Sequence, residues 1–138
     1  MAVLSEQDAV LLQALADACL SRLDAMMPQH LANVSWAYAT ASFEPAQLFQ
    51  ALAGSVLDRS LDGFEPRHIA NIVWALAKLG LTHDQLLHQI GDYVATADVS
   101  GWTSRDLSIL VWASASLDFV HDKLFKRVAT EMSKQHRL

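Results

Sequence analysis

Three tryptophans divide the chain into segments of equal length. Trp36, Trp74 and Trp112 are 38 residues apart, and the residues around them recur with the same spacing. The copies read PQHLANVSWAYA from 28, PRHIANIVWALAKLG from 66 and, in a more degenerate form, SRDLSILVWASA from 104. A period of 20–50 residues is typical of tandem structural repeats, which bury a core only by stacking neighbouring units. This repeat limits the fold more than any single residue does.

Within each unit the apolar residues follow a helical spacing. Leu31, Val34 and Tyr38 stand at i, i+3 and i+7, which is one face of an α-helix and not the alternation of a strand. The pattern predicts an all-α protein, an α-solenoid of tandem two-helix repeats with a period of 38 residues. We expect first helices over 28–41, 66–79 and 104–117, and second helices over 6–22, 45–60, 83–98 and 121–135.

Residues that favour helix ends stand at the expected boundaries. Pro28 and Pro66 suit a first helical turn, where a missing N–H costs nothing. Gly80 suits the end of a first helix. Thr82 and Gln85 have the spacing of a capping box, which would open the second helix of that unit.

A half-copy of the repeat precedes the three full ones. LLQALADACLSRLDAM (11–26) matches LFQALAGSVLDRSLDGF (48–64) when one residue is deleted. We therefore expect one helical-repeat domain over 1–138, made of a trailing half-repeat at 1–27 and repeats at 28–65, 66–103 and 104–138. A chain of this length can bury a substantial core.

Composition excludes several classes of protein. Ten Lys and Arg stand against fifteen Asp and Glu, a net charge of −5. This charge opposes strong non-specific binding of nucleic acid by the whole surface and leaves a local basic stripe open. The apolar runs are interrupted too often for a membrane span. The N-terminus, MAVLSEQDAV, is acidic and has no Arg, so we expect no secretory signal or transit peptide in it.

The residues predict no enzyme, cofactor or metal site. Cys19 is the only cysteine, which leaves no disulfide framework and no Cys-based metal site. His83 and His121 stand at equivalent positions, each followed by Asp, but a metal needs three or four convergent ligands. We expect them to be polar residues at helix starts. The chain has no nucleophile elbow and no kinase motif.

The recurring tryptophan has two interpretations. A helical wheel at about 100° per residue makes the first helix apolar over more than half its circumference. Ala32, Ala39 and Trp36 extend the apolar face along one edge. We expect the alanines to permit close helix approach and the tryptophans to fill the gap between neighbouring units. A platform on which bases stack is the alternative interpretation.

Asn33 and Asn71 also have two interpretations. Asn is unfavourable inside a helix and needs a hydrogen-bond partner. The partner is either a backbone carbonyl of the next first helix or a base edge at an exposed surface. In the third copy Ile109 takes this position.

The motif P-x-H-[LI]-A-N-x-x-W-A-x-A resembles the octotricopeptide-repeat family and its relatives. These include the helical repeats that precede RAP domains and the FAST-kinase-like organelle proteins. The resemblance covers nearly the whole chain and implies an α-solenoid that binds single-stranded RNA on its first helices, roughly one base per unit. It implies a non-enzymatic role in the stability, processing or translation of mitochondrial or chloroplast transcripts. Three units alone would bind weakly, so useful affinity would need more repeats in the same chain or in an oligomer, and we expect the chain to be part of a longer array.

The resemblance places the RNA-facing candidates on the polar arc of the first helices, which is the part of their circumference outside the apolar face. Arginines and lysines there would contact phosphate, and amides would read bases. The candidates are Gln29, Asn33, Thr40, Arg67, His68, Asn71, Lys78, Arg105 and Ser116. The alternative function is a protein-interaction scaffold of HEAT or armadillo type, which an acidic chain fits equally well. RNA binding predicts that cations line the groove along the first helices. A protein partner predicts apolar or acidic groups there instead.

Overall fold

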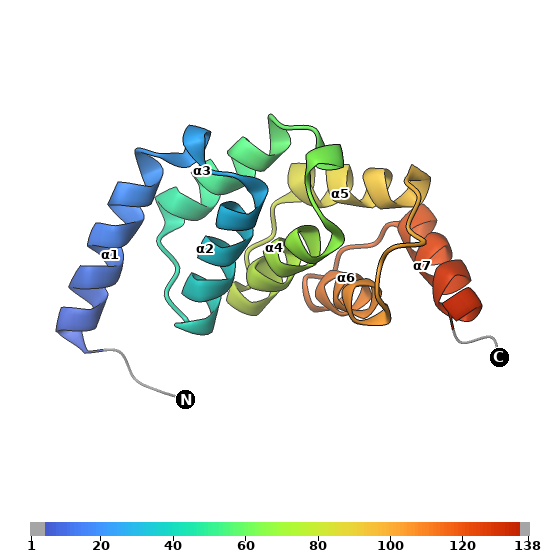
Figure 1. The fold of residues 1–138 in the computed structure, drawn as a ribbon. Coiled ribbons are helices and arrows are strands. Elements are labelled where there is room, and N and C mark those ends of the chain that lie inside the picture. Colours follow the sequence, from blue (N-terminus) through green and yellow to red (C-terminus); the bar gives the residue numbers. More distant parts are fainter. Residues whose placement is uncertain (1–4, 136–138) are drawn as a thin grey trace.

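The computed structural model describes residues 5–135, which form seven α-helices and no strand, so the protein is all-α (Figure 1). The helices are α1 (Glu6–Leu20), α2 (Pro28–Thr40), α3 (Ala46–Leu57), α4 (Pro66–Leu79), α5 (Asp84–Thr96), α6 (Ser104–Ser116) and α7 (Asp122–Gln135). Two short 3₁₀ helices, η1 (Leu23–Ala25) and η2 (Leu61–Gly63), lie in the connections. All seven predicted helices are present within a few residues of their predicted ends. In this part of the chain, no helix is both long and apolar enough to cross a membrane.

The helices pack in two rows. α4 packs between α2 and α6, and these are the two most extensive helix contacts in the molecule. In the other row α1 contacts α3, α3 contacts α5, and α5 contacts α7. Figure 1 shows α1 and α7 at opposite ends. Each row therefore joins alternate helices of the sequence, and the first row holds all three tryptophan motifs.

Small residues determine how closely the first row packs. Ala32 and Ala39 of α2 are fully buried, and both belong to the predicted apolar edge. Leu31, Ile69 and Leu107, at equivalent positions of the three motifs, are also buried in the core. Because alanine has no side chain beyond Cβ, the backbones of neighbouring helices can approach closely along this edge.

Most helix ends follow the sequence signals. Pro28 and Pro66 are the first residues of α2 and α4, and Gly80 ends α4 with a left-handed φ of 68°. The predicted capping box of Thr82 is wrong. The cap of α5 is His83, whose Nδ1 accepts a hydrogen bond from the Leu86 N–H at 3.2 Å. An imidazole nitrogen can take the role of a hydroxyl because it is also a hydrogen-bond acceptor.

An arginine ties the connection between α1 and α2 to the second row. Arg59 donates hydrogen bonds to the carbonyl oxygens of Leu23, at 2.8 Å, and Met26, at 2.5 Å. Both carbonyls lie in or beside η1. Arg59 thereby holds η1 and the residue after it against the segment that follows α3.

Candidate nucleic-acid interface

The tryptophans lie over the seams of the first row. Trp36 and Trp112 are 47% and 46% exposed, and Trp74 is half-buried. The rings of Trp36 and Trp74 are stacked, with centroids 6.4 Å apart and planes 28° apart. They pack against each other between α2 and α4, as expected of residues that fill the gap between neighbouring units, although Trp36 remains nearly half exposed there. The buried alanines close the seam, so the indoles lie on its outer side.

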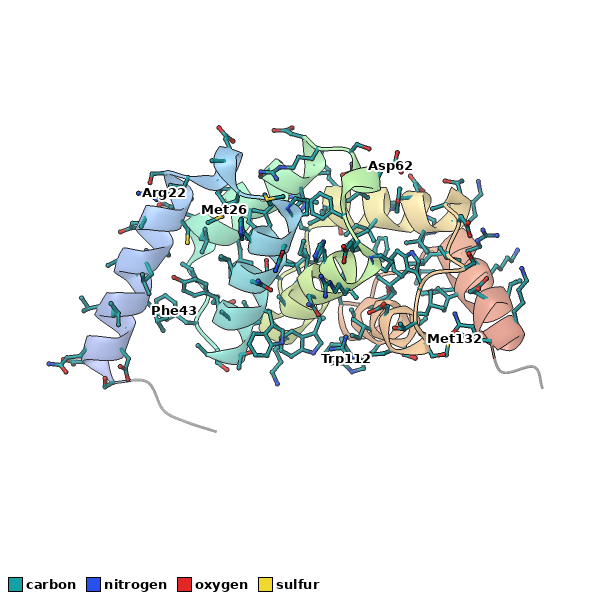
Figure 2. All side chains as sticks on the ribbon, in the orientation of Figure 1. Arg22, Met26, Phe43, Asp62, Trp112 and Met132 are labelled. Carbon is teal, nitrogen blue, oxygen red and sulfur yellow. The ribbon has the colours of Figure 1, made fainter. Side chains whose placement is uncertain are left out.

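A hollow between α4 and α6 is open to solvent and has an indole from each helix. Its lining residues are Trp74, Arg105, Ser108, Ile109 and Trp112. Figure 2 shows Trp112 beside α6 at the lower edge of the molecule. Unlike the Trp36–Trp74 pair, these two indoles line a hollow that a flat apolar ligand can enter. Arg105 supplies a cation at the same place.

Polar candidates flank Trp36 and Trp74 on their own helices, whereas Trp112 has Ile109 on one side and the candidate Ser116 on the other. On α4, Asn71 precedes Trp74 by three residues and Lys78 follows it by four, so all three share one strip of the helix surface. Asn33 and Thr40 flank Trp36 in the same way. The exposed candidates are Gln29, Asn33, Thr40, Arg67, Lys78, Arg105 and Ser116, and Asn71 is half-buried. The first row therefore has aromatic, amide and cationic groups on one face.

The asparagines do not form the hydrogen bond between units that was one of their two interpretations. On α2 the side chains that form hydrogen bonds within the described residues are His30, Ser35 and Tyr38. On α4 the corresponding side chain is His68. The amides of Asn33 and Asn71 therefore keep their donors and acceptors for solvent or a ligand.

Each arginine candidate has an acidic neighbour. Arg67 Nε lies 2.9 Å from Glu65 Oε2, and an Nη of Arg105 lies 3.8 Å from Asp106 Oδ1. Both guanidinium groups are largely exposed. The Arg67–Glu65 pair is exposed on both sides and is worth about 0–1 kcal/mol, so an anionic ligand can compete for Arg67. Asp106 is buried, but at 3.8 Å its Oδ1 is too far from Arg105 for a hydrogen bond, so the exposed guanidinium of Arg105 is accessible to a ligand.

His68 cannot contact a ligand, because it is only 8% exposed. Its Nδ1 accepts a hydrogen bond from the Glu65 N–H at 3.1 Å, which caps α4. Its Nε2 is buried without a hydrogen-bond partner. Burial lowers the pKa of this imidazole; Glu65 raises that pKa and Arg67 lowers it. The sequence prediction of His68 as an RNA contact is therefore wrong, because its ring folds back over the start of α4 to form this cap, whereas Arg67 in the same turn is exposed.

The other histidines within residues 5–135, His30, His83, His88 and His121, form hydrogen bonds within the protein. His121 Nε2 lies 2.8 Å from Asp92 Oδ1, and its Nδ1 accepts a hydrogen bond from the Leu124 N–H at 3.0 Å. Within residues 5–135, no three His, Cys, Asp or Glu side chains converge as a metal site would require.

The exposed tryptophans were the feature that sequence reasoning weighted least. A signal for them was available, because Trp36 lies at the edge of the apolar face, next to the polar arc that holds Gln29, Thr40 and Asn33. A large ring at such an edge is covered on one side only.

Comparison with known proteins identifies no family for this chain. No model of a known protein family matches the chain, and no curated protein matches its sequence significantly.

Proposed function

We propose that the face formed by α2, α4 and α6 binds single-stranded RNA. In this proposal the chain is a non-enzymatic segment of an α-solenoid built from two-helix repeats of 38 residues. The observation that carries it is the row of partly exposed tryptophans at equivalent positions of three neighbouring helices. Only the resemblance of the motif supports a role in an organelle gene-expression factor. Such a factor would act in the stability, processing or translation of transcripts in a mitochondrion or chloroplast.

Stacking supplies the sequence-independent part of the binding. Every base has a flat aromatic face, and stacking on an aromatic side chain is worth about 1–3 kcal/mol per base. The hollow that Trp74 and Trp112 line is open, so a base can reach both indoles. Asn71, which makes no side-chain hydrogen bond in the described residues, is the nearest amide in sequence for a base edge.

Cations beside the tryptophans supply the phosphate contacts. Arg67, Lys78 and Arg105 are exposed on the first row. Their placement answers the objection raised by the net charge of −5, because electrostatic attraction acts over about one Debye length, roughly 8–10 Å, and not over the whole molecule. Three units reading roughly one base each would bind weakly, and further repeats in the same array would raise the affinity.

The competing function is a protein-interaction scaffold of HEAT or armadillo type. One observation favours it: α1 has an exposed apolar face that includes Val10, Leu11 and Leu15. That face belongs to the other row of helices, so a protein partner there does not exclude RNA on α2, α4 and α6.

Fluorescence anisotropy with a pool of single-stranded RNAs tests the proposal. We expect binding at about 50 mM salt that weakens at about 150 mM salt. The triple variant Arg67→Ala, Lys78→Ala, Arg105→Ala should weaken binding and lower the salt slope by about two, since each phosphate contact on a single strand contributes about 0.7. The matched control replaces three exposed lysines of α7 by Ala: Lys123, Lys126 and Lys134.

A second variant tests stacking separately from charge. Trp112→Ala should weaken RNA binding about fivefold or more, because it removes a stacking platform. Val111→Ala, at an exposed neighbour on α6, should leave the affinity unchanged. Folded wild-type protein that binds no RNA at low salt would refute the proposal. If the two triple variants weakened RNA binding equally, the binding would be non-specific charge attraction and not a contact of the first row.

A further inference from the structure

A small hollow in the middle repeat lies between α3, the end of α4 and the loop that leads to α5. Its volume is about 140 Å³, and its lining residues are Ala46, Phe49, Gln50, Leu76, Leu81, Thr82 and His83. The wall is mainly apolar. The hollow shares no residue with the one that Trp74 and Trp112 line, so any ligand of it is independent of the proposed RNA surface.

The loop that borders the hollow has the same backbone conformation in all three repeats. A residue of left-handed φ, between 54° and 68°, follows each first helix. The next residue donates its N–H to the carbonyl five positions before it, at 2.8–3.0 Å. This pattern ends a helix and directs the side chain of that residue back toward the helix. The residue is Phe43 in the first repeat, Leu81 in the middle one and Phe119 in the third.

The third repeat shows which group fills the equivalent space. The Phe119 side chain is only 8% exposed, and its ring centroid lies 4.9 Å from that of His88 and 6.2 Å from that of His121. The residues 38 positions before these three all line the hollow: Gln50, Leu81 and His83. The hollow therefore lies where the third repeat holds a phenyl ring, because the leucine of the middle repeat is smaller.

The middle repeat also lacks a hydrogen-bond acceptor that the third repeat has. Nδ1 of His121 accepts a backbone N–H, so Nε2 carries the proton and donates it to Asp92 Oδ1 at 2.8 Å. His83 caps α5 through Nδ1 in the same way, so its Nε2 also carries a proton. Gly54 stands 38 positions before Asp92 and has no side chain to accept that proton.

We infer that this hollow binds a small molecule with one aromatic ring and a hydrogen-bond acceptor, of the size of phenol. The ring would lie beside Leu81 and Phe49, in the place that Phe119 takes in the third repeat. The acceptor would bind the Nε2–H of His83. The volume fits one ring, since an apolar cavity of about 150 Å³ can bind benzene. The lining residues include no Asp, Glu, Lys or Arg, which favours an uncharged ligand.

Repeats added at either end of the array would leave this hollow unchanged. The middle repeat already has a neighbour on each side, because α4 packs between α2 and α6, and α5 contacts both α3 and α7. The hollow lies within this repeat and the helices next to it, so a longer solenoid supplies no further group to fill it.

Phenol is the probe, and its binding to the full chain is followed by NMR through the backbone amides of Gln50 and Thr82. We expect shifts that saturate with phenol and with toluene, which has the ring without the acceptor. His83→Ser keeps a hydroxyl to cap α5 but is too short to reach the ligand. It should lower the affinity for phenol relative to toluene by about twofold to tenfold, as expected for one lost hydrogen bond.

A second variant restores the ring that the other two repeats have. Leu81→Phe should abolish the saturable shifts, because the new side chain would occupy the hollow. It should also raise the midpoint of urea unfolding, because the filled space gains contacts. Leu79→Phe is the matched control: Leu79 is a half-buried leucine of α4 that does not line the hollow, and phenol binding should be unchanged.

Four results would overturn the inference. The first is folded protein that shows no saturable shifts with phenol or toluene. The second is a Leu81→Phe variant that still binds phenol as wild type does. The third is an unchanged ratio of phenol to toluene affinity in His83→Ser. The fourth is tighter binding of N-acetylphenylalanine amide than of phenol, because the hollow would then hold a side chain of a protein partner. None of these outcomes bears on RNA binding by α2, α4 and α6.

Discussion

Two glycines inside helices should respond to the same substitution in opposite ways. Gly91 lies in α5 under the ring of His121. A Cβ on Gly91 would be 2.5 Å from His121 Cδ2 and 2.9 Å from its Cγ and Nε2. The ring cannot move away easily, because it accepts a hydrogen bond from the Leu124 N–H and contacts Asp92 Oδ1 at 2.8 Å. Gly54 in α3 has nothing within 4 Å of the same position.

The expected change in the free energy of unfolding is the sum of opposing effects. Alanine favours a helix interior over glycine by about 1 kcal/mol. At Gly91 the overlap with His121 costs about 1–3 kcal/mol as overpacking, and displacing the ring loses a helix cap worth about 1 kcal/mol. Gly91→Ala should therefore destabilise the fold by about 1–3 kcal/mol. Gly54→Ala has only the first effect and should stabilise it by up to about 1 kcal/mol.

Urea denaturation followed by circular dichroism measures both changes. The free energy of unfolding should fall for Gly91→Ala and rise slightly for Gly54→Ala, with similar slopes against urea. A Gly91→Ala variant as stable as wild type would refute the reasoning, because it would mean that the His121 ring moves without cost. A Gly54→Ala variant that destabilises the fold would refute the account of open space at α3.

Two further predictions concern His68 and Arg59. The folded pKa of His68 is lowered by burial, so the unfolded chain takes up a proton first as pH falls below about 6.5, and stability should fall there. His68→Gln keeps an acceptor for the Glu65 N–H, so its unfolding free energy should fall less between about pH 7 and about pH 5; an equal fall would contradict this account. Arg59→Ala removes both hydrogen bonds to the α1–α2 connection and should cost about 1.5–3 kcal/mol in urea denaturation. Arg22→Ala, at an exposed position in the same connection, should cost almost nothing, and equal losses would show that the bonds of Arg59 contribute no stability.

The helices could be predicted from the sequence because their signals are local. The spacing of Leu31, Val34 and Tyr38 repeats fully in the second copy and in its first two positions in the third, and Pro66 and Gly80 mark the ends of one helix. Such signals need only the residues of one or two turns. The cap of α5 was predicted wrongly because Thr82 and His83 are both acceptable caps, and the choice depends on how the loop enters the helix.

The candidate site could be predicted only in part, because exposure depends on contacts between helices. The polar arc was predicted correctly for the side chains of Gln29, Arg67 and Lys78, which are exposed. His68 lies near the same arc in projection but is buried at the start of α4. The exposure of Trp36 depends on how closely the alanines bring α2 and α4 together, which is a property of the packed pair and not of either sequence.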